Sequence, residues 1–154
     1  MRAIVLGAML ALLPTFAWAD GWVAQLEDDE GGQVMTASVE GDPAAGVTPR
    51  LRLLCAGSEG IMLRYEMAAG TASPGSEANL LFENESQQIT LPMAYEDMDG
   101  AFAAYFPKTD PILGLLENGP DVFISEASGN YPAQSFTLKG STKAIAKVLK
   151  DCKG

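Results

Sequence analysis

Hydrophobic and polar residues alternate along most of the chain beyond residue 20, and glycine, proline, asparagine or aspartate interrupts the alternation every eight to twelve residues. A period of two places successive side chains on opposite faces of a strand, and closely spaced turn residues connect short strands. The sequence therefore predicts a mainly β fold, either a β-sandwich or a bent antiparallel sheet. The nine expected strands span residues 22–27, 33–39, 50–55, 61–67, 79–83, 88–91, 101–106, 121–125 and 133–138.

The third and fourth expected strands have one apolar face and one charged face. The charged face carries Arg50, Arg52 and Arg64, and a hairpin register that places Arg52 opposite Glu66 would give a favourable cross-strand pair. We expect these arginines to make surface ion pairs or, alternatively, to form an anion-binding or partner-binding site. The predicted core face consists of Leu51, Leu53, Cys55, Ile61, Leu63, Tyr65 and Met67.

Two segments have the helical period instead. Residues 110–117 have a proline near their start, an apolar stripe, and Asp110 in position to cap the helix, so they predict a short helix that covers an end of the sheet. Residues 141–152 predict a second helix, with Ser141 as its N-terminal cap. Its apolar stripe consists of Ala144, Ile145, Val148, Leu149 and Cys152.

Three lysines, Lys143, Lys147 and Lys150, lie on the opposite face of the second helix. Lysines close to the C-terminal end of a helix complement its dipole and keep the outer face hydrated. A second hypothesis is that this face docks on an acidic partner or on the acidic body of the same chain. Residues 139–154 contain five of the ten basic residues of the sequence, so this is its one basic region.

The first nineteen residues are typical of a secretory signal peptide. A positive end at Arg2 precedes an apolar run over residues 3–13, and the small residues Ala17 and Ala19 offer a cleavage site. The run is too short to span a bilayer stably, although an uncleaved anchor is the alternative. We therefore expect a leader over residues 1–19 and a single β-rich domain over residues 20–154. This domain is expected in the periplasm or outside the cell, without membrane insertion once the leader is removed.

Two cysteines occur at positions that face the expected core. An even number of inward-facing cysteines in an exported protein predicts a disulfide, here between Cys55 and Cys152. This bond would tie the last helix to the sheet. A redox-active pair is the alternative, but the Cys-x-x-Cys spacing of such pairs is missing.

Composition excludes several kinds of chemistry. The sequence contains no histidine, so Ser-His-Asp and Cys-His nucleophile pairs and imidazole metal sites are excluded, and two cysteines cannot form a four-thiolate metal site. The net charge is −10, or −11 once Arg2 leaves with the leader, and such a charge disfavours nucleic acid as a partner.

The remaining candidates for chemistry have structural explanations. Asp97 and Asp99 could hold calcium, but the EF-hand spacing is missing and a solvated turn explains them better. Ser58 and Ser141 lack the spacing of known serine nucleophile motifs. A catalytic site of paired carboxylates, as in glycoside hydrolases, stays an alternative, because any two acidic residues can come together in a folded chain. We therefore predict no catalytic residue, cofactor site or metal site.

Three segments resemble one group of bacterial proteins. The Trp22 strand, residues 49–55 (PRLRLLC), and residues 136–144 (FTLKGSTKA) running into residues 149–152 (LKDC) resemble small periplasmic proteins of the VasI type, which are associated with type VI secretion, and related uncharacterised families. The shared form is a strand ending in cysteine, a Phe-x-Leu-x-Gly-Ser strand and a closing helix with a second cysteine. The resemblance implies a β-rich fold and the Cys55–Cys152 bond, and it implies no catalytic residue.

These observations lead to one principal functional hypothesis and two alternatives. The principal hypothesis is a non-enzymatic binding or accessory protein of the bacterial cell envelope that contacts a partner protein through a sheet edge or an exposed strand face. The first alternative is an acidic inhibitor or binder of a cationic enzyme such as lysozyme. The second is a hydrolase that uses paired carboxylates.

Overall fold

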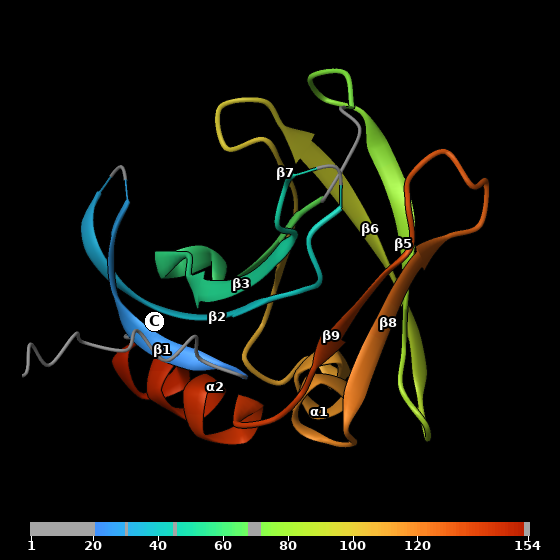
Figure 1. Cartoon of the computed structure of the whole chain (residues 1–154). Helices are drawn as coiled ribbons and strands as arrows, with labels where there is room; N and C mark the ends of the chain where they lie inside the picture. The colour runs from blue at the N-terminus through green and yellow to red at the C-terminus, as the bar shows by residue number, and fades with distance from the viewer. Residues whose placement is uncertain (1–20, 30, 45, 68–71, 153–154) are drawn as a thin grey trace, which may run out of the picture.

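The computed structural model describes residues 21–152 except residues 30, 45 and 68–71, so the expected leader over residues 1–19 lies outside the described residues. Within the described part, strands and helices occur in the predicted order (Figure 1). Their bounds are β1 Val23–Asp29, β2 Gly32–Glu40, β3 Arg50–Cys55, the 3-10 turn Gly57–Glu59, β4 Ile61–Glu66, β5 Glu77–Glu83, β6 Gln88–Glu96, β7 Ala101–Phe106, α1 Pro111–Glu117, β8 Asp121–Glu126, β9 Gln134–Thr137 and α2 Ser141–Asp151.

The nine described strands form one sheet in the order β1-β2-β3-β4-β7-β6-β5-β8-β9, and all neighbours pair antiparallel. The prediction of a mainly β fold is confirmed, in the form of a bent antiparallel sheet. Figure 1 shows the sheet bending round, so that β1 and β9, the two ends of the strand order, approach one another.

Trp22 holds the two ends of the sheet together. Its backbone nitrogen donates to the carbonyl of Lys139 at 2.8 Å, and its indole Nε1 donates to the carbonyl of Thr137 at 2.9 Å. The chain must pass very close here, because a Cβ on Gly21 would lie 2.6 Å from the Lys139 carbonyl oxygen. The start of β1 is therefore fixed against the segment that joins β9 to α2.

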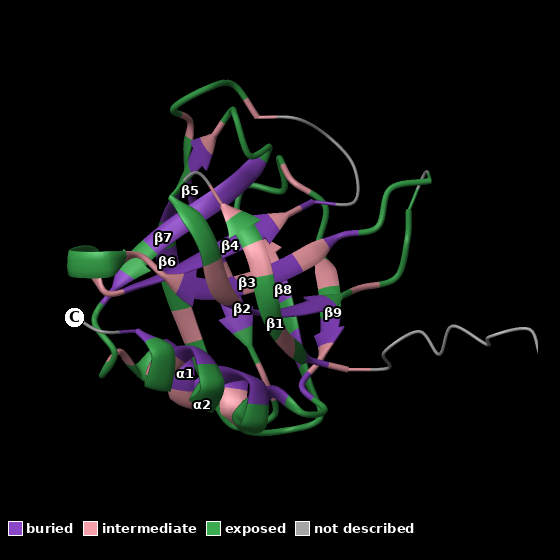
Figure 2. Cartoon of the chain, turned by 90° about the vertical axis from the view of Figure 1, so that its left-hand side faces the viewer, coloured by how far each residue is buried: buried purple, intermediate pink, exposed green. Residues whose placement is uncertain are grey.

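The inner face of this bent sheet encloses the main apolar core. The strand residues predicted for the core face are buried or packed against the core, and α1 and α2 add their apolar stripes at one end (Figure 2). The largest fully buried side chains include Tyr65, Phe82, Phe102 and Phe136. Burial of aromatic side chains of this size contributes a large share of the free energy of folding.

The two helices begin in different ways. In α1, Asp110 accepts a hydrogen bond from the backbone nitrogen of Ile112 at 3.0 Å, as predicted for its cap. The prediction that Ser141 caps α2 is wrong. Gly140 is the cap residue, with φ of 81°, and Ser141 is buried inside the first turn. A Cβ on Gly140 would lie 3.2 Å from the Trp22 carbonyl oxygen. Positive φ and this close contact both favour glycine.

The predicted pairing of Arg52 with Glu66 across β3 and β4 is wrong in its register. Arg50 lies opposite Glu66, and Arg52 lies opposite Arg64. Arg52 still reaches Glu66 along the diagonal, with 3.5 Å between Nη1 and Oε1. Two arginines thus lie directly opposite each other, an arrangement that is unfavourable without nearby negative charge.

The Cys55–Cys152 disulfide is present, with the two Cα atoms 5.2 Å apart and 97 residues apart in sequence. It joins the last residue of β3 to the residue after α2. Lys108, which follows β7, also donates a hydrogen bond to the Cys152 carbonyl oxygen. The C-terminal end of α2 is therefore fixed to the sheet by one covalent bond and one charge-assisted hydrogen bond.

Replacing both Cys55 and Cys152 with alanine should lower the free energy of unfolding by about 3–5 kcal/mol, because the disulfide restricts a long loop in the unfolded chain. Urea unfolding followed by circular dichroism measures this difference. A reducing agent should destabilise the unchanged protein by a similar amount and leave the double variant unaffected. Free thiols that react in the denatured, unreduced protein would contradict the bond.

Candidate functional site: a covered arginine cluster and an exposed lysine face

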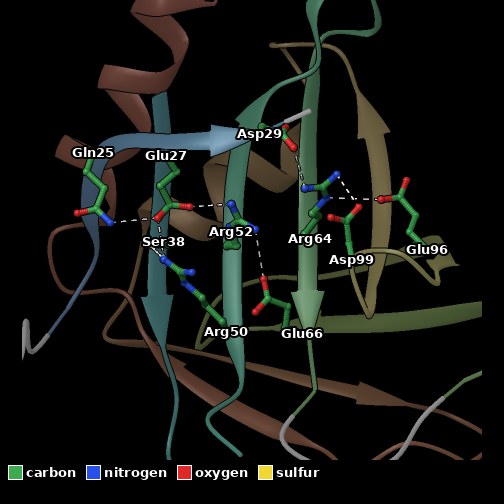
Figure 3. A network of polar contacts seen from close by, with 10 residues as sticks. All are labelled: Gln25, Glu27, Asp29, Ser38, Arg50, Arg52, Arg64, Glu66, Glu96 and Asp99. Atoms are coloured by element: carbon green, nitrogen blue, oxygen red, sulfur yellow. Dashed lines mark hydrogen bonds and ion pairs between the residues drawn. The ribbon is translucent and has the colours of Figure 1, made fainter. Parts of the chain in front are cut away.

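The outer face of β3 and β4 carries a cluster of three arginines and five carboxylates, called here the arginine cluster (Figure 3). The β1–β2 hairpin bends over this face, and in Figure 3 the end of β1 lies across β2 towards β3 and β4. The predicted solvated face is therefore partly covered. The cluster consists of Arg50, Arg52, Arg64, Glu27, Asp29, Glu66, Glu96 and Asp99.

Glu27 of β1 joins two of the arginines. Its Oε1 lies 2.7 Å from Nη2 of Arg50, and its Oε2 lies 2.6 Å from Nη2 of Arg52. Gln25 donates a further hydrogen bond to Oε1 at 3.1 Å, and Arg50 also donates to Ser38 Oγ at 3.3 Å. One carboxylate therefore links β1 to two neighbouring residues of one face of β3.

Arg64 is the most buried arginine of the cluster, with 8% of its side chain exposed. Its Nη2 lies 2.9 Å from Asp99, its Nε lies 3.5 Å from Glu96, and its Nη1 lies 3.8 Å from Asp29. A guanidinium buried this far needs such partners, because an unpaired buried charge is strongly destabilising. These carboxylates come from β1, β6 and the β6–β7 turn, so Arg64 links three parts of the chain.

The electrostatic environment keeps Glu27 ionised. Burial by itself raises the pKa of this carboxyl, but the hydrogen bond from Gln25 and the positive charges of Arg50 and Arg52 outweigh burial and hold the pKa below 4.5. A general acid needs the opposite shift. Glu27 is therefore suited to a structural ion pair and not to proton donation near neutral pH.

The anion-binding hypothesis for Arg50, Arg52 and Arg64 meets a specific obstacle in this arrangement. Each guanidinium already contacts at least one carboxylate, so an incoming anion would have to displace that carboxylate.

Asp99, which the sequence analysis considered as a calcium ligand, is one of these carboxylates. In the described part of the chain, no group of three or more acidic or cysteine side chains is arranged to hold a metal ion.

Sequence analysis named Glu66 as a partner of Arg52 but missed the other carboxylates as partners of the arginines, although a signal for two of them exists. Alternation along β1 places Gln25, Glu27 and Asp29 on one face, opposite to the face of Leu26. That pattern marks a polar stripe on an edge strand. It does not show that the stripe bends over β3 and β4, which depends on the curvature of the hairpin.

Lys143, Lys147 and Lys150 lie exposed on the outward face of α2, called here the lysine face. None of the three forms an ion pair with another described residue. The helix beneath them is held by the buried residues Ala144 and Val148 and by the disulfide. The lysine face is thus a positive surface on a fixed support, as the sequence predicted for the outer side of this helix.

Tyr105 occupies an exposed position beside the arginine cluster. Its hydroxyl donates to Glu96 at 2.7 Å, and burial together with this hydrogen bond raises the pKa of Tyr105 to about 12. A cavity of about 550 Å³ lies beside Tyr105 and Lys108. The hydroxyl therefore stays protonated near neutral pH and acts as a hydrogen-bond donor to the cluster.

In comparisons with known proteins, no family model and no curated protein matches this chain. Among solved structures, the chain is similar to invasion associated protein B from Bartonella henselae, with a TM-score of 0.55 and 12% sequence identity. The match covers 84% of this chain and 90% of that protein. At this identity the similarity shows a shared fold, and the VasI-type resemblance is not confirmed by it.

In the described residues, no helix combines the length and apolar character required to cross a membrane.

Replacing Glu27 with glutamine should lower the free energy of unfolding near pH 7 by about 1–3 kcal/mol, because two half-buried arginines lose an ionised partner. The lowered pKa of Glu27 contributes stability above pH 4.5, and this contribution is lost as the pH falls through the folded-state pKa. The difference between the variant and the unchanged protein should therefore shrink below about pH 4.5.

Urea unfolding at several pH values measures this difference. The matched control is Glu77→Gln, since Glu77 is exposed on β5 and lies outside the arginine cluster. The control should change the free energy by less than about 0.5 kcal/mol. An equal effect of both substitutions would contradict the structural role of Glu27.

Proposed function

We propose that this protein is exported to the bacterial cell envelope and acts there as a binding or accessory protein, without a catalytic step of its own. The observation that carries the proposal is the lysine face of α2. Lys143, Lys147 and Lys150 are exposed and form no ion pair within the described residues, whereas the three arginines of β3 and β4 have carboxylate partners. The partner expected at this face is a protein with an acidic surface.

The disulfide supports the exported location. Disulfides persist in oxidising compartments such as the periplasm and are rare in the cytosol. The leader expected over residues 1–19 supplies the route, and the VasI-type resemblance suggests an accessory role beside a secretion system. The fold shared with a bacterial invasion-associated protein is compatible with such a role.

The helix that carries the lysine face is fixed at both ends, and this also favours a role in binding. A surface that is already ordered loses less conformational entropy when a partner binds. The C-terminal end of α2 is held by the disulfide and by Lys108, and its N-terminal end begins beside the Trp22 carbonyl. The three lysines are therefore presented at a constant spacing on the helix.

A photo-reactive amino acid in place of Lys147 should form a defined adduct with one envelope protein in living cells. Replacing Lys143 and Lys150 with glutamine in the same protein should reduce the adduct by about tenfold, because two charge pairs are lost. The adduct is measured by mass spectrometry after denaturing purification.

The matched control removes the same net charge elsewhere. Gln87→Glu and Gln88→Glu, on the exposed β5–β6 hairpin, also change the net charge by −2. This control should leave the adduct unchanged. No adduct at position 147, or an equal loss in both variants, would contradict the proposal.

The net charge of −10 favours a second candidate, a binder of a cationic enzyme such as lysozyme. In that case the acidic body makes the contact, and the lysine face takes no part. Capture on immobilised lysozyme should then weaken steeply with salt and persist when all three lysines become glutamine. Failure to retain the protein at low salt would exclude this candidate.

A further inference from the structure

The outer face of β5, β6, β8 and β9 presents a row of exposed side chains, one from each strand. Glu83 lies opposite both Gln88 and Phe123, and Phe123 lies opposite Ser135, so all four share one face of the sheet. All four are exposed. The surface formed by this row and by exposed Asp121, which shares the face of Phe123 on β8, is called here the Phe123 face.

Phe123 is the exposed aromatic residue at the centre of this face. It is 47% exposed, whereas the other four phenylalanines of the described residues are buried. Its neighbours Val122 and Ile124 are buried on the inner side of β8, so the strand that carries the ring is fixed to the core. Aromatic side chains presented on an ordered surface are enriched where proteins bind each other.

Two carboxylates flank the Phe123 ring. Glu83 is directly opposite on β5, which places the two Cβ atoms about 5 Å apart, and Asp121 lies two residues earlier on β8, about 7 Å away. Both are exposed, and neither forms an ion pair with another described residue. Beside Glu83 lies a polar cavity of about 330 Å³. Its lining consists of Glu83, Asn84, Ser86, Gln87 and Gln88.

An aromatic ring between two carboxylates suits an arginine side chain. The face of the ring attracts a cation, and a guanidinium stacks on it because the group is planar and weakly hydrated. The N–H groups at the edge of the guanidinium can then donate to a neighbouring carboxylate. A lysine has the same charge but no planar group to stack.

The other half of the outer face already combines an aromatic residue, a carboxylate and an arginine. Tyr105 has the same exposed fraction as Phe123, 47%, and its hydroxyl donates to Glu96. Glu96 in turn lies 3.5 Å from Arg64, so the chain itself supplies the arginine there. The strands of the Phe123 face contain no lysine or arginine. An arginine at Phe123 therefore has to come from another molecule.

The overall charge favours a different protein over a second copy of this chain. A net charge of −10 attracts a basic protein over a distance, whereas two copies repel each other. The occupant that fits the Phe123 face is thus a basic segment of a partner.

We propose that the Phe123 face binds a basic, extended segment of a partner protein, with one arginine stacked on Phe123 and paired with Glu83. A second basic residue, two positions along the segment, pairs with Asp121. The spacing agrees, because Glu83 and Asp121 are about 8 Å apart across the two strands and alternate residues of an extended segment are about 7 Å apart. This inference goes beyond the proposed function, since it concerns a second face with the opposite charge to the lysine face.

The probe is the acetylated and amidated peptide Ser-Arg-Ser-Arg-Ser, titrated into the isotope-labelled protein near physiological salt and followed by amide chemical shifts in NMR. The signals of Glu83, Asp121 and Phe123 should shift. Lysine in place of both arginines should weaken binding about threefold, because stacking is lost. Citrulline, which keeps the shape of arginine without its charge, should weaken binding about tenfold.

Two substitutions in the protein test the assigned contacts. Phe123→Leu keeps an apolar side chain but removes the ring, so the affinity for the arginine peptide should fall about threefold and approach that for the lysine peptide. Glu83→Gln should lower the affinity for the arginine peptide about fivefold, because a charge-assisted pair is lost.

Each substitution has a matched control. Tyr105→Leu removes an equally exposed ring, and Glu77→Gln removes the same charge from the same face of β5, about 20 Å from Glu83. Both controls should leave the affinity for the arginine peptide unchanged. Thermal unfolding of all four variants checks that they are folded.

Four results would overturn the inference. Equal affinity for the arginine and citrulline peptides would show that charge plays no part, and unchanged affinity in Phe123→Leu would show the same for the ring. Shift changes confined to residues outside β5, β8 and β9 would place the peptide elsewhere. Shift changes on β8 in the protein alone at rising concentration would identify a second copy as the occupant. The adduct at position 147 does not depend on any of these results, so the proposed function is tested separately.

Discussion

Two hydrogen bonds from Trp22 hold the start of β1 against the segment between β9 and α2, and much of the remaining structure depends on them. They bring together elements from the two ends of the strand order, so the sheet surrounds its core instead of lying flat. They also set where α2 begins, because Gly140 packs against the Trp22 carbonyl.

The arginines and the lysines of this acidic protein occupy different surroundings, which match the chemistry of their side chains. The three arginines of β3 and β4 lie under the bent β1–β2 hairpin with carboxylates around them. The planar guanidinium binds several carboxylate oxygens at once and is weakly hydrated, so it suits a covered site. The lysines of α2 remain in water, where a strongly hydrated ammonium group is most stable. The arginine cluster therefore stabilises the fold, and the exposed positive charge is concentrated on one helix.

The lysine face lies on a helix that is held firmly in place. Only the apolar stripe of the helix contacts the core, and the disulfide and the Lys108 hydrogen bond secure its last residue. β1, which lies beside the start of α2, is fixed by its pairing with β2 and by the ion pairs of Glu27. The three lysines are therefore held in fixed positions on the surface.

The sequence by itself determined the nine strands, the two helices, the Asp110 cap and the core face of β3 and β4, because these features follow from local periodicity and local backbone geometry. The inward-facing positions of Cys55 and Cys152 also sufficed to predict their bond. Only the tertiary structure decided that Arg52 lies opposite Arg64, that β1 covers the arginines and that Leu26 and Asp151 line one cavity. Register, hairpin curvature and the bend of a sheet accumulate over many strands, so no short stretch of sequence contains enough information to specify them.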